Sequence, residues 1–87
     1  MEWRERIVTD PDLLMGKPVI KGTRLSVELI LGWLAQGWTT EQLLENYPQL
    51  KQLDIQAALA FASDMLREER YIAISRAGGE ATAGLPA

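Results

Sequence analysis

Segments whose hydrophobic positions follow a helical period alternate along this chain with short segments rich in glycine, proline and charge. A helix is predicted from Ser26 to Gln36, and Ser26 is a suitable N-cap because its hydroxyl can accept a backbone N–H of the first turn. Its main apolar stripe consists of Val27, Ile30, Leu31 and Leu34. Leu29 and Trp33 widen the apolar arc to roughly 200°, which is more than one core contact can cover.

Two more helices are predicted, over residues 40–46 and 52–71. Gly37 favours the end of the first helix, and Thr39 with Gln42 forms a capping box at the start of the second. Pro48 closes the second helix, because the residue before a proline is disfavoured in helical geometry. The positions of the third helix predicted to face the core are Ile55, Ala58, Leu59, Ala62, Met65 and Leu66, with Phe61 at the margin.

The first 24 residues are predicted to form a small hairpin or an extended arm. Residues 3–8 alternate imperfectly between apolar and polar side chains, which favours a short strand. The Thr9-Asp10-Pro11-Asp12 sequence that follows is typical of a turn. Residues 18–20 are a second candidate strand, and Gly16 and Gly22 lie on either side of it.

The predicted fold class is mainly α, with three helices, a short N-terminal β-hairpin and a flexible tail. The domain is expected to span residues 1–72, because residues 73–87 are small and glycine-rich and cannot repay the entropy of ordering. The chain has 87 residues, of which 47% are hydrophobic, and this is enough for one folded domain. A chain so short has modest stability, so we expect a homodimer.

Composition excludes several kinds of chemistry. The chain has no cysteine and no histidine, so disulfides, thiolate chemistry, imidazole catalysis and the usual zinc sites are ruled out. No cofactor or metal is expected. No stretch reaches the roughly 18 uninterrupted apolar residues of a membrane span, and no secretory leader is recognisable, so a cytoplasmic protein without membrane contact is expected.

Two glycines, a proline, three cations and an apolar pair occur together in the nine-residue sequence Gly16-Lys17-Pro18-Val19-Ile20-Lys21-Gly22-Thr23-Arg24. The net charge of −3 argues against non-specific coating of nucleic acid, but five of the nine cations fall within residues 1–24. One interpretation is structural: the glycines shape turns, and the lysines are solvated. The other is that Lys17, Lys21 and Arg24 bind an anion, such as a nucleic-acid phosphate or an acidic patch of a partner.

The chain resembles the domain of unknown function 433 family over about residues 4–66. The resemblance is carried by Arg6-Ile7, Thr9-Asp10-Pro11, residues 16–24, Gly37, Tyr47-Pro48, Ile55 and Ala58-Leu59. It implies a homeodomain-like three-helix fold with an N-terminal hairpin, and a role as an antitoxin paired with a PIN-like nuclease toxin. Lys51 stands where the family usually places a threonine N-cap for the third helix, and Asp54 in the first turn is expected to compensate in part.

The second and third predicted helices suggest a helix-turn-helix unit with the third helix as the DNA reader. Gln56 could pair with an adenine edge, Ala60 and Ser63 would permit close approach to the groove, and Arg67 and Arg70 could reach phosphates. The same residues also describe an ordinary solvent-facing side of a helix, and both interpretations stay open.

Two apolar groups are candidates for a protein interface. Leu29 and Trp33 either pack under the hairpin or form an exposed patch. Tyr71, Ile72 and Ile74 either fray at the helix end or become ordered on a partner.

Three carboxylate pairs could in principle do acid/base work: Asp10 with Asp12, Glu41 with Glu45, and Glu68 with Glu69. No nucleophile, base and orienting group converge in the sequence, so a catalytic site is not expected. The expected function is that of a non-catalytic antitoxin that binds a PIN-like toxin and also contacts operator DNA. A protein-interaction adaptor and a stand-alone DNA-binding regulator are the alternatives.

Overall fold

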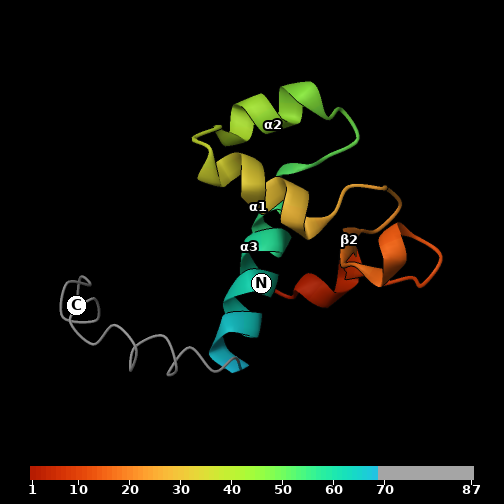
Figure 1. Cartoon of the computed structure of the whole chain (residues 1–87). Helices are drawn as coiled ribbons and strands as arrows, with labels where there is room; N and C mark the ends of the chain where they lie inside the picture. Colours follow the sequence, from red (N-terminus) through yellow and green to blue (C-terminus); the bar gives the residue numbers. More distant parts are fainter. Residues whose placement is uncertain (69–87) are drawn as a thin grey trace.

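A computed structural model describes residues 1–68 of the chain. Three helices and a two-stranded antiparallel hairpin make up the fold, which confirms the mainly α class with an N-terminal hairpin (Figure 1). The elements are the 3-10 turn η1 (Trp3–Glu5), β1 (Ile7–Val8), the 3-10 turn η2 (Leu14–Gly16), β2 (Val19–Ile20), α1 (Val27–Ala35), α2 (Thr40–Asn46) and α3 (Gln52–Glu68). Within these residues no helix is both long and apolar enough to cross a membrane. The expected tail, residues 73–87, lies outside them.

The helices begin and end where local capping chemistry predicts. The Ser26 hydroxyl accepts the Leu29 N–H at 2.9 Å at the start of α1. At the start of α2 the capping box is complete, because the Thr39 hydroxyl accepts the Gln42 N–H at 3.1 Å and the Gln42 side chain accepts the Thr39 N–H at 2.8 Å. Gly37, between the two helices, has a φ of +98°, which favours glycine at that position.

The N-terminal strand is shorter than predicted. Only Ile7 and Val8 pair with β2, opposite Ile20 and Val19 respectively. The prediction of a strand from residue 3 was wrong, because residues 3–5 form a 3-10 turn instead. This turn places the Trp3 side chain against α3 rather than in a sheet.

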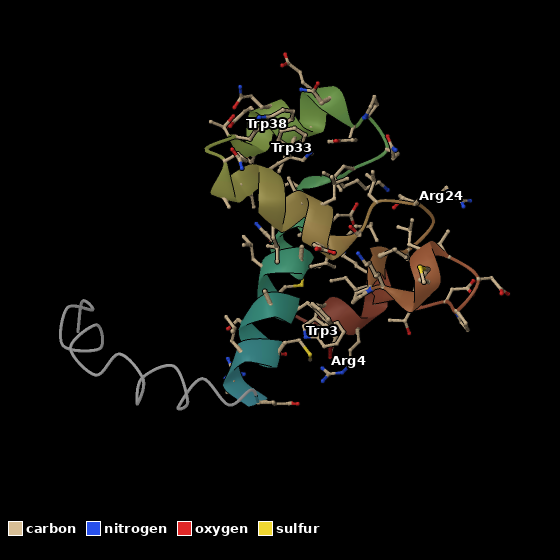
Figure 2. The ribbon with its side chains drawn as sticks, in the orientation of Figure 1. Trp3, Arg4, Arg24, Trp33 and Trp38 are labelled. Carbon is tan, nitrogen blue, oxygen red and sulfur yellow. The ribbon has the colours of Figure 1, made fainter. Side chains whose placement is uncertain are left out.

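Trp3 fixes the N-terminus to the middle of α3 (Figures 1 and 2). Its ring meets Phe61 edge to face, with centroids 4.8 Å apart and planes at 89°. Its indole N–H donates to Asp64 Oδ2 at 2.6 Å, and the Arg4 guanidinium lies 4.5 Å from the ring centroid. The first residues are therefore part of the fold and not a free arm.

The core lies where the three helices meet the hairpin. Its largest fully buried side chains are Ile20, Ile30, Leu43, Ile55 and Val19. Two leucines predicted to be in the core are not: Leu59 is 48% exposed and Leu66 is 61% exposed. The buried positions of α3 include Ile55 and Ala58, with Phe61 packed against the core, whereas Leu59 and Leu66 lie at the exposed margin of this face.

Candidate functional site

The Gly16 to Arg24 segment contains a tight turn held by its own backbone and threonine. Gly22 has a φ of +82°, and the Thr23 N–H donates to the Ile20 carbonyl at 3.0 Å. The Thr23 hydroxyl donates to the same carbonyl at 2.8 Å and accepts the Leu25 N–H at 3.0 Å. The structural interpretation of Gly22 and Thr23 is thus supported by the geometry.

The two lysines of this segment go to different places. The Val27 N–H donates to the Pro18 carbonyl at 2.9 Å, so the start of α1 lies beside Lys17. The Lys17 ammonium donates to Glu28 Oε1 at 2.9 Å, and this hydrogen bond and charge lower the pKa of the Glu28 carboxyl. Lys17 is therefore paired on the α1 side and is separated from Lys21.

Lys21 faces the start of α3 instead. Its N–H donates to the Arg6 carbonyl at 2.8 Å, and the Arg6 guanidinium donates to Asp54 Oδ1 at 3.0 Å. A pocket of about 380 Å³ lies between this turn and α3. Its walls are formed by Glu5, Arg6, Lys21, Gly22, Thr23, Gln49, Lys51 and Asp54.

Asp54 organises the pocket wall. Its side chain is 8% exposed, and its second oxygen, Oδ2, accepts the Lys51 N–H at 2.9 Å. This is the compensation predicted for the missing threonine cap: the carboxylate satisfies the backbone N–H of the residue that precedes α3. The ion pair with Arg6, in contrast, was not predicted, because it joins residues 48 positions apart in sequence.

Most cations of residues 1–68 are paired with a carboxylate. The four salt bridges are Arg4–Glu2, Arg6–Asp54, Lys17–Glu28 and Arg67–Asp64. Within the described chain this leaves Lys21, Arg24 and Lys51 without an acidic partner. Arg24 extends outward from the turn that follows β2 (Figure 2). The uncompensated positive charge thus lies around this turn and the start of α3.

The side of α3 predicted to read DNA is only partly available. Gln56 and Ser63 are exposed, as a reader would require. Arg67 is held within the helix, because it donates to Asp64 Oδ1 at 2.7 Å and to the Ser63 hydroxyl at 3.4 Å. The Trp3 indole N–H, with a smaller contribution from Arg67, holds the pKa of Asp64 below its usual value against the effect of partial burial. Arg70 lies outside the described residues.

The two candidate interface residues of α1 line the same groove, but Trp33 also makes aromatic contacts within the chain. Trp33 stacks on Trp38 with centroids 4.0 Å apart, and its indole N–H donates to the Tyr47 hydroxyl at 3.0 Å (Figure 2). It therefore packs against the α1–α2 corner and not under the hairpin. Leu29 is 36% exposed and lies with Lys17 along an open groove of about 710 Å³. The remaining candidates, Tyr71, Ile72 and Ile74, lie outside the described residues.

Comparison with known proteins identifies the family. The family model described as Protein of unknown function (DUF433) matches residues 7–62, which is more than half of the chain. The chain belongs to the DUF433 family. A crystal structure of a DUF433 member protein from Anabaena variabilis ATCC 29413 has a similar fold, with a TM-score of 0.66 and 30% sequence identity. That match covers 68% of this chain and 58% of the other.

A longer protein is also similar to this DUF433 chain. The uncharacterized protein y4eO of Sinorhizobium fredii (strain NBRC 101917 / NGR234) is 36% identical over 70 residues, which make up 79% of this chain. The match spans 32% of the length of y4eO, about a third of that protein.

The DUF433 match includes most of the pocket wall. Lys21, Lys51 and Asp54 fall inside residues 7–62, and Arg6 lies one position before the match begins. Asp64, which holds Trp3, falls just after its end. Six of the eight wall residues therefore belong to the matched residues, and Glu5 and Arg6 directly precede them.

Two of the candidate acid/base carboxylates, Asp10 and Glu41, make local hydrogen bonds, and Glu69 lies outside the described residues. Asp10 Oδ1 accepts the Asp12 N–H at 2.9 Å, which shapes the turn after β1. The Thr40 hydroxyl donates to Glu41 at 3.3 Å on the exposed side of α2. Within residues 1–68 no group of three or more acidic side chains is placed to hold a metal ion.

Proposed function

We propose that this DUF433 chain is a non-catalytic binding protein, the antitoxin of a type II toxin–antitoxin pair, and that it binds a PIN-like nuclease toxin. The observation that carries the proposal is the pair of exposed leucines on α3. Leu59 and Leu66 are seven residues apart, two helical turns, so they share one side of the helix. The resemblance to antitoxins of this family supports the choice of partner.

An apolar helix side of this kind suits docking into a hydrophobic groove of another protein. Each leucine is already exposed in the single chain, so burying it in a partner adds apolar contact without disturbing the core. The groove along α1, which contains Leu29, is a second place for contacts with the same partner or with another copy of this chain.

Co-expression with the product of the neighbouring gene, which the proposal expects to be a PIN-like protein, tests the proposal. The wild-type chain should copurify with that protein, and the double variant Leu59→Ser/Leu66→Ser should lose the complex. Leu53→Ser is the matched control, because Leu53 is 47% exposed on a different side of α3. Failure of the wild type to form a complex would defeat the toxin assignment, and equal loss with Leu53→Ser would defeat the assigned surface.

Operator binding by the same protein is a second candidate function. It is favoured by the order of α2, the connection over residues 47–51, and α3 with exposed Gln56 and Ser63. A gel shift on the DNA upstream of the gene, repeated at several salt concentrations, tests it. Gln56→Ala should reduce discrimination between upstream and unrelated DNA, whereas equal affinity for both sequences in the wild type would contradict operator recognition. A protein-interaction adaptor remains the alternative if neither experiment succeeds.

A further inference from the structure

We propose that the pocket between the hairpin turn and the start of α3 binds a phosphate-class oxyanion. The pocket lies at the start of α3 and its wall does not include Leu59 or Leu66, so the inference does not rest on the toxin-binding proposal. It replaces the cation cluster suggested by the sequence, because the structure separates Lys17 from Lys21 and brings Lys51 and Arg6 to Lys21 instead.

Three hydrogen bonds bring together the chain positions that carry the cations of the pocket. The Lys21 N–H bonds the Arg6 carbonyl, the Arg6 guanidinium bonds Asp54 Oδ1, and Asp54 Oδ2 accepts the Lys51 N–H. The residue before β1, the turn after β2 and the residue before α3 therefore each contribute one cation. Because the backbone at these three positions is fixed by hydrogen bonds, only the two lysine side chains have to be ordered when a ligand arrives.

The charge of the pocket favours an anion. Arg6 neutralises the buried carboxylate of Asp54, and Lys21 and Lys51 have no acidic partner within residues 1–68. Glu5 is the other carboxylate of the wall, so three cations face two acids. The full chain has a net charge of −3, so this excess of positive charge is local and opposite in sign to the rest of the molecule.

The donor set suits phosphate in particular. A guanidinium offers a planar pair of N–H groups, and two ammonium groups add point charges that match the several oxygens of a phosphoryl group. The Gly22 N–H has no acceptor within the described chain, and beyond Lys21 and Thr23 no residue has an atom within 4 Å of the position where a Cβ of Gly22 would stand. A volume of about 380 Å³ is at the small end of ligand pockets.

Titration with inorganic phosphate, followed by ¹H–¹⁵N spectra at constant ionic strength, tests the site directly. Saturable shifts are expected at the Gly22 and Thr23 amides, with no such shifts when chloride replaces phosphate. In Lys21→Ala/Lys51→Ala the affinity should fall about tenfold or more, because two charge-assisted contacts are lost. Lys17→Ala is the matched control and should bind like the wild type, since Lys17 is an equally exposed lysine paired with Glu28.

A second titration separates the two sources of such a phosphate. If the ligand is the backbone of nucleic acid, a short duplex should compete with phosphate, and Arg24→Ala should weaken the duplex without changing phosphate affinity. If the ligand is a free phosphate compound, the duplex should not compete. Absence of saturable shifts with phosphate, or equal shifts in Lys21→Ala/Lys51→Ala, overturns the proposal whether or not the toxin complex forms.

Discussion

Replacement of Asp54 by alanine is expected to destabilise the protein more than any exposed substitution. The change removes two contacts at once: the hydrogen bond from the Lys51 N–H at 2.9 Å and the ion pair with Arg6 at 3.0 Å. The first contact caps α3, and the second joins Arg6, the residue before β1, to the same helix. Asp54→Ala therefore weakens the helix and its attachment to the hairpin together.

The expected loss of stability in Asp54→Ala depends on how deeply the two partners are buried. Loss of an N-terminal helix cap costs about 1 kcal/mol. Loss of one partner of a fully buried ion pair costs about 3–5 kcal/mol, but the Arg6 side chain is 31% exposed and can regain water, so about 1 kcal/mol is a reasonable share here. The total is about 2 kcal/mol, which corresponds to a fall in Tm of about 8–16 °C for a domain of this size.

Urea unfolding followed by circular dichroism measures this loss. The midpoint should fall in Asp54→Ala while the m value stays constant, because the surface exposed on unfolding is unchanged. Asp54→Asn is the matched control: it keeps an oxygen for the Lys51 N–H and loses the charge, so its loss should be about 1 kcal/mol. A stability of Asp54→Ala within about 0.5 kcal/mol of the wild type would refute the reasoning.

Three further predictions concern the helix ends, the aromatic corner and acid. Gly37→Ala should lower the free energy of unfolding in urea by about 1 kcal/mol, because φ at this position is +98°. Gly32→Ala should raise it by up to about 1 kcal/mol, because Gly32 lies inside α1 with open space where a Cβ would stand. The reverse order of stability would contradict these assignments. Tyr47→Phe removes the hydroxyl that accepts the Trp33 indole N–H, so near-ultraviolet circular dichroism should change and stability should fall by about 1 kcal/mol; an unchanged spectrum would count against that contact. Asp64 has a lowered pKa in the folded protein, so its stabilising effect is present above its usual pKa of 3.8 and is lost as pH falls through the pKa of the folded state. Between about pH 5 and about pH 2, Asp64→Asn should therefore lose less stability than the wild type. Parallel losses in the two proteins would contradict this.

The helices could be predicted because their signals are local. Ser26, Thr39 and Gln42 act within one helical turn of their own positions, so the sequence alone indicates where α1 and α2 begin. The burial of α3 could not be predicted in the same way. Leu59 and Leu66 follow the helical period of a core face, but whether that face is covered depends on the placement of the other elements.

The candidate site likewise combines features that the local sequence predicts with features that depend on the fold. Sequence proximity placed Lys17 and Lys21 in one cluster, yet the hydrogen bond from Val27 to Pro18 puts Lys17 beside α1 while the hairpin puts Lys21 beside Arg6. Although Lys17 and Lys21 are only four positions apart, their side chains lie on different surfaces. The cations that do meet are 15 to 45 residues apart in sequence, and no local pattern indicates that they are neighbours.

The contact between Trp3 and Asp64 has a consequence for how the protein is made. The two residues are 61 positions apart, so the indole has no partner until nearly all of α3 has left the ribosome. During most of translation the apolar residues of the hairpin lack the part of the core that α3 contributes. A chain stalled before α3 would expose Trp3 to chaperones and proteases, so synthesis of α3 is the step that completes the described fold.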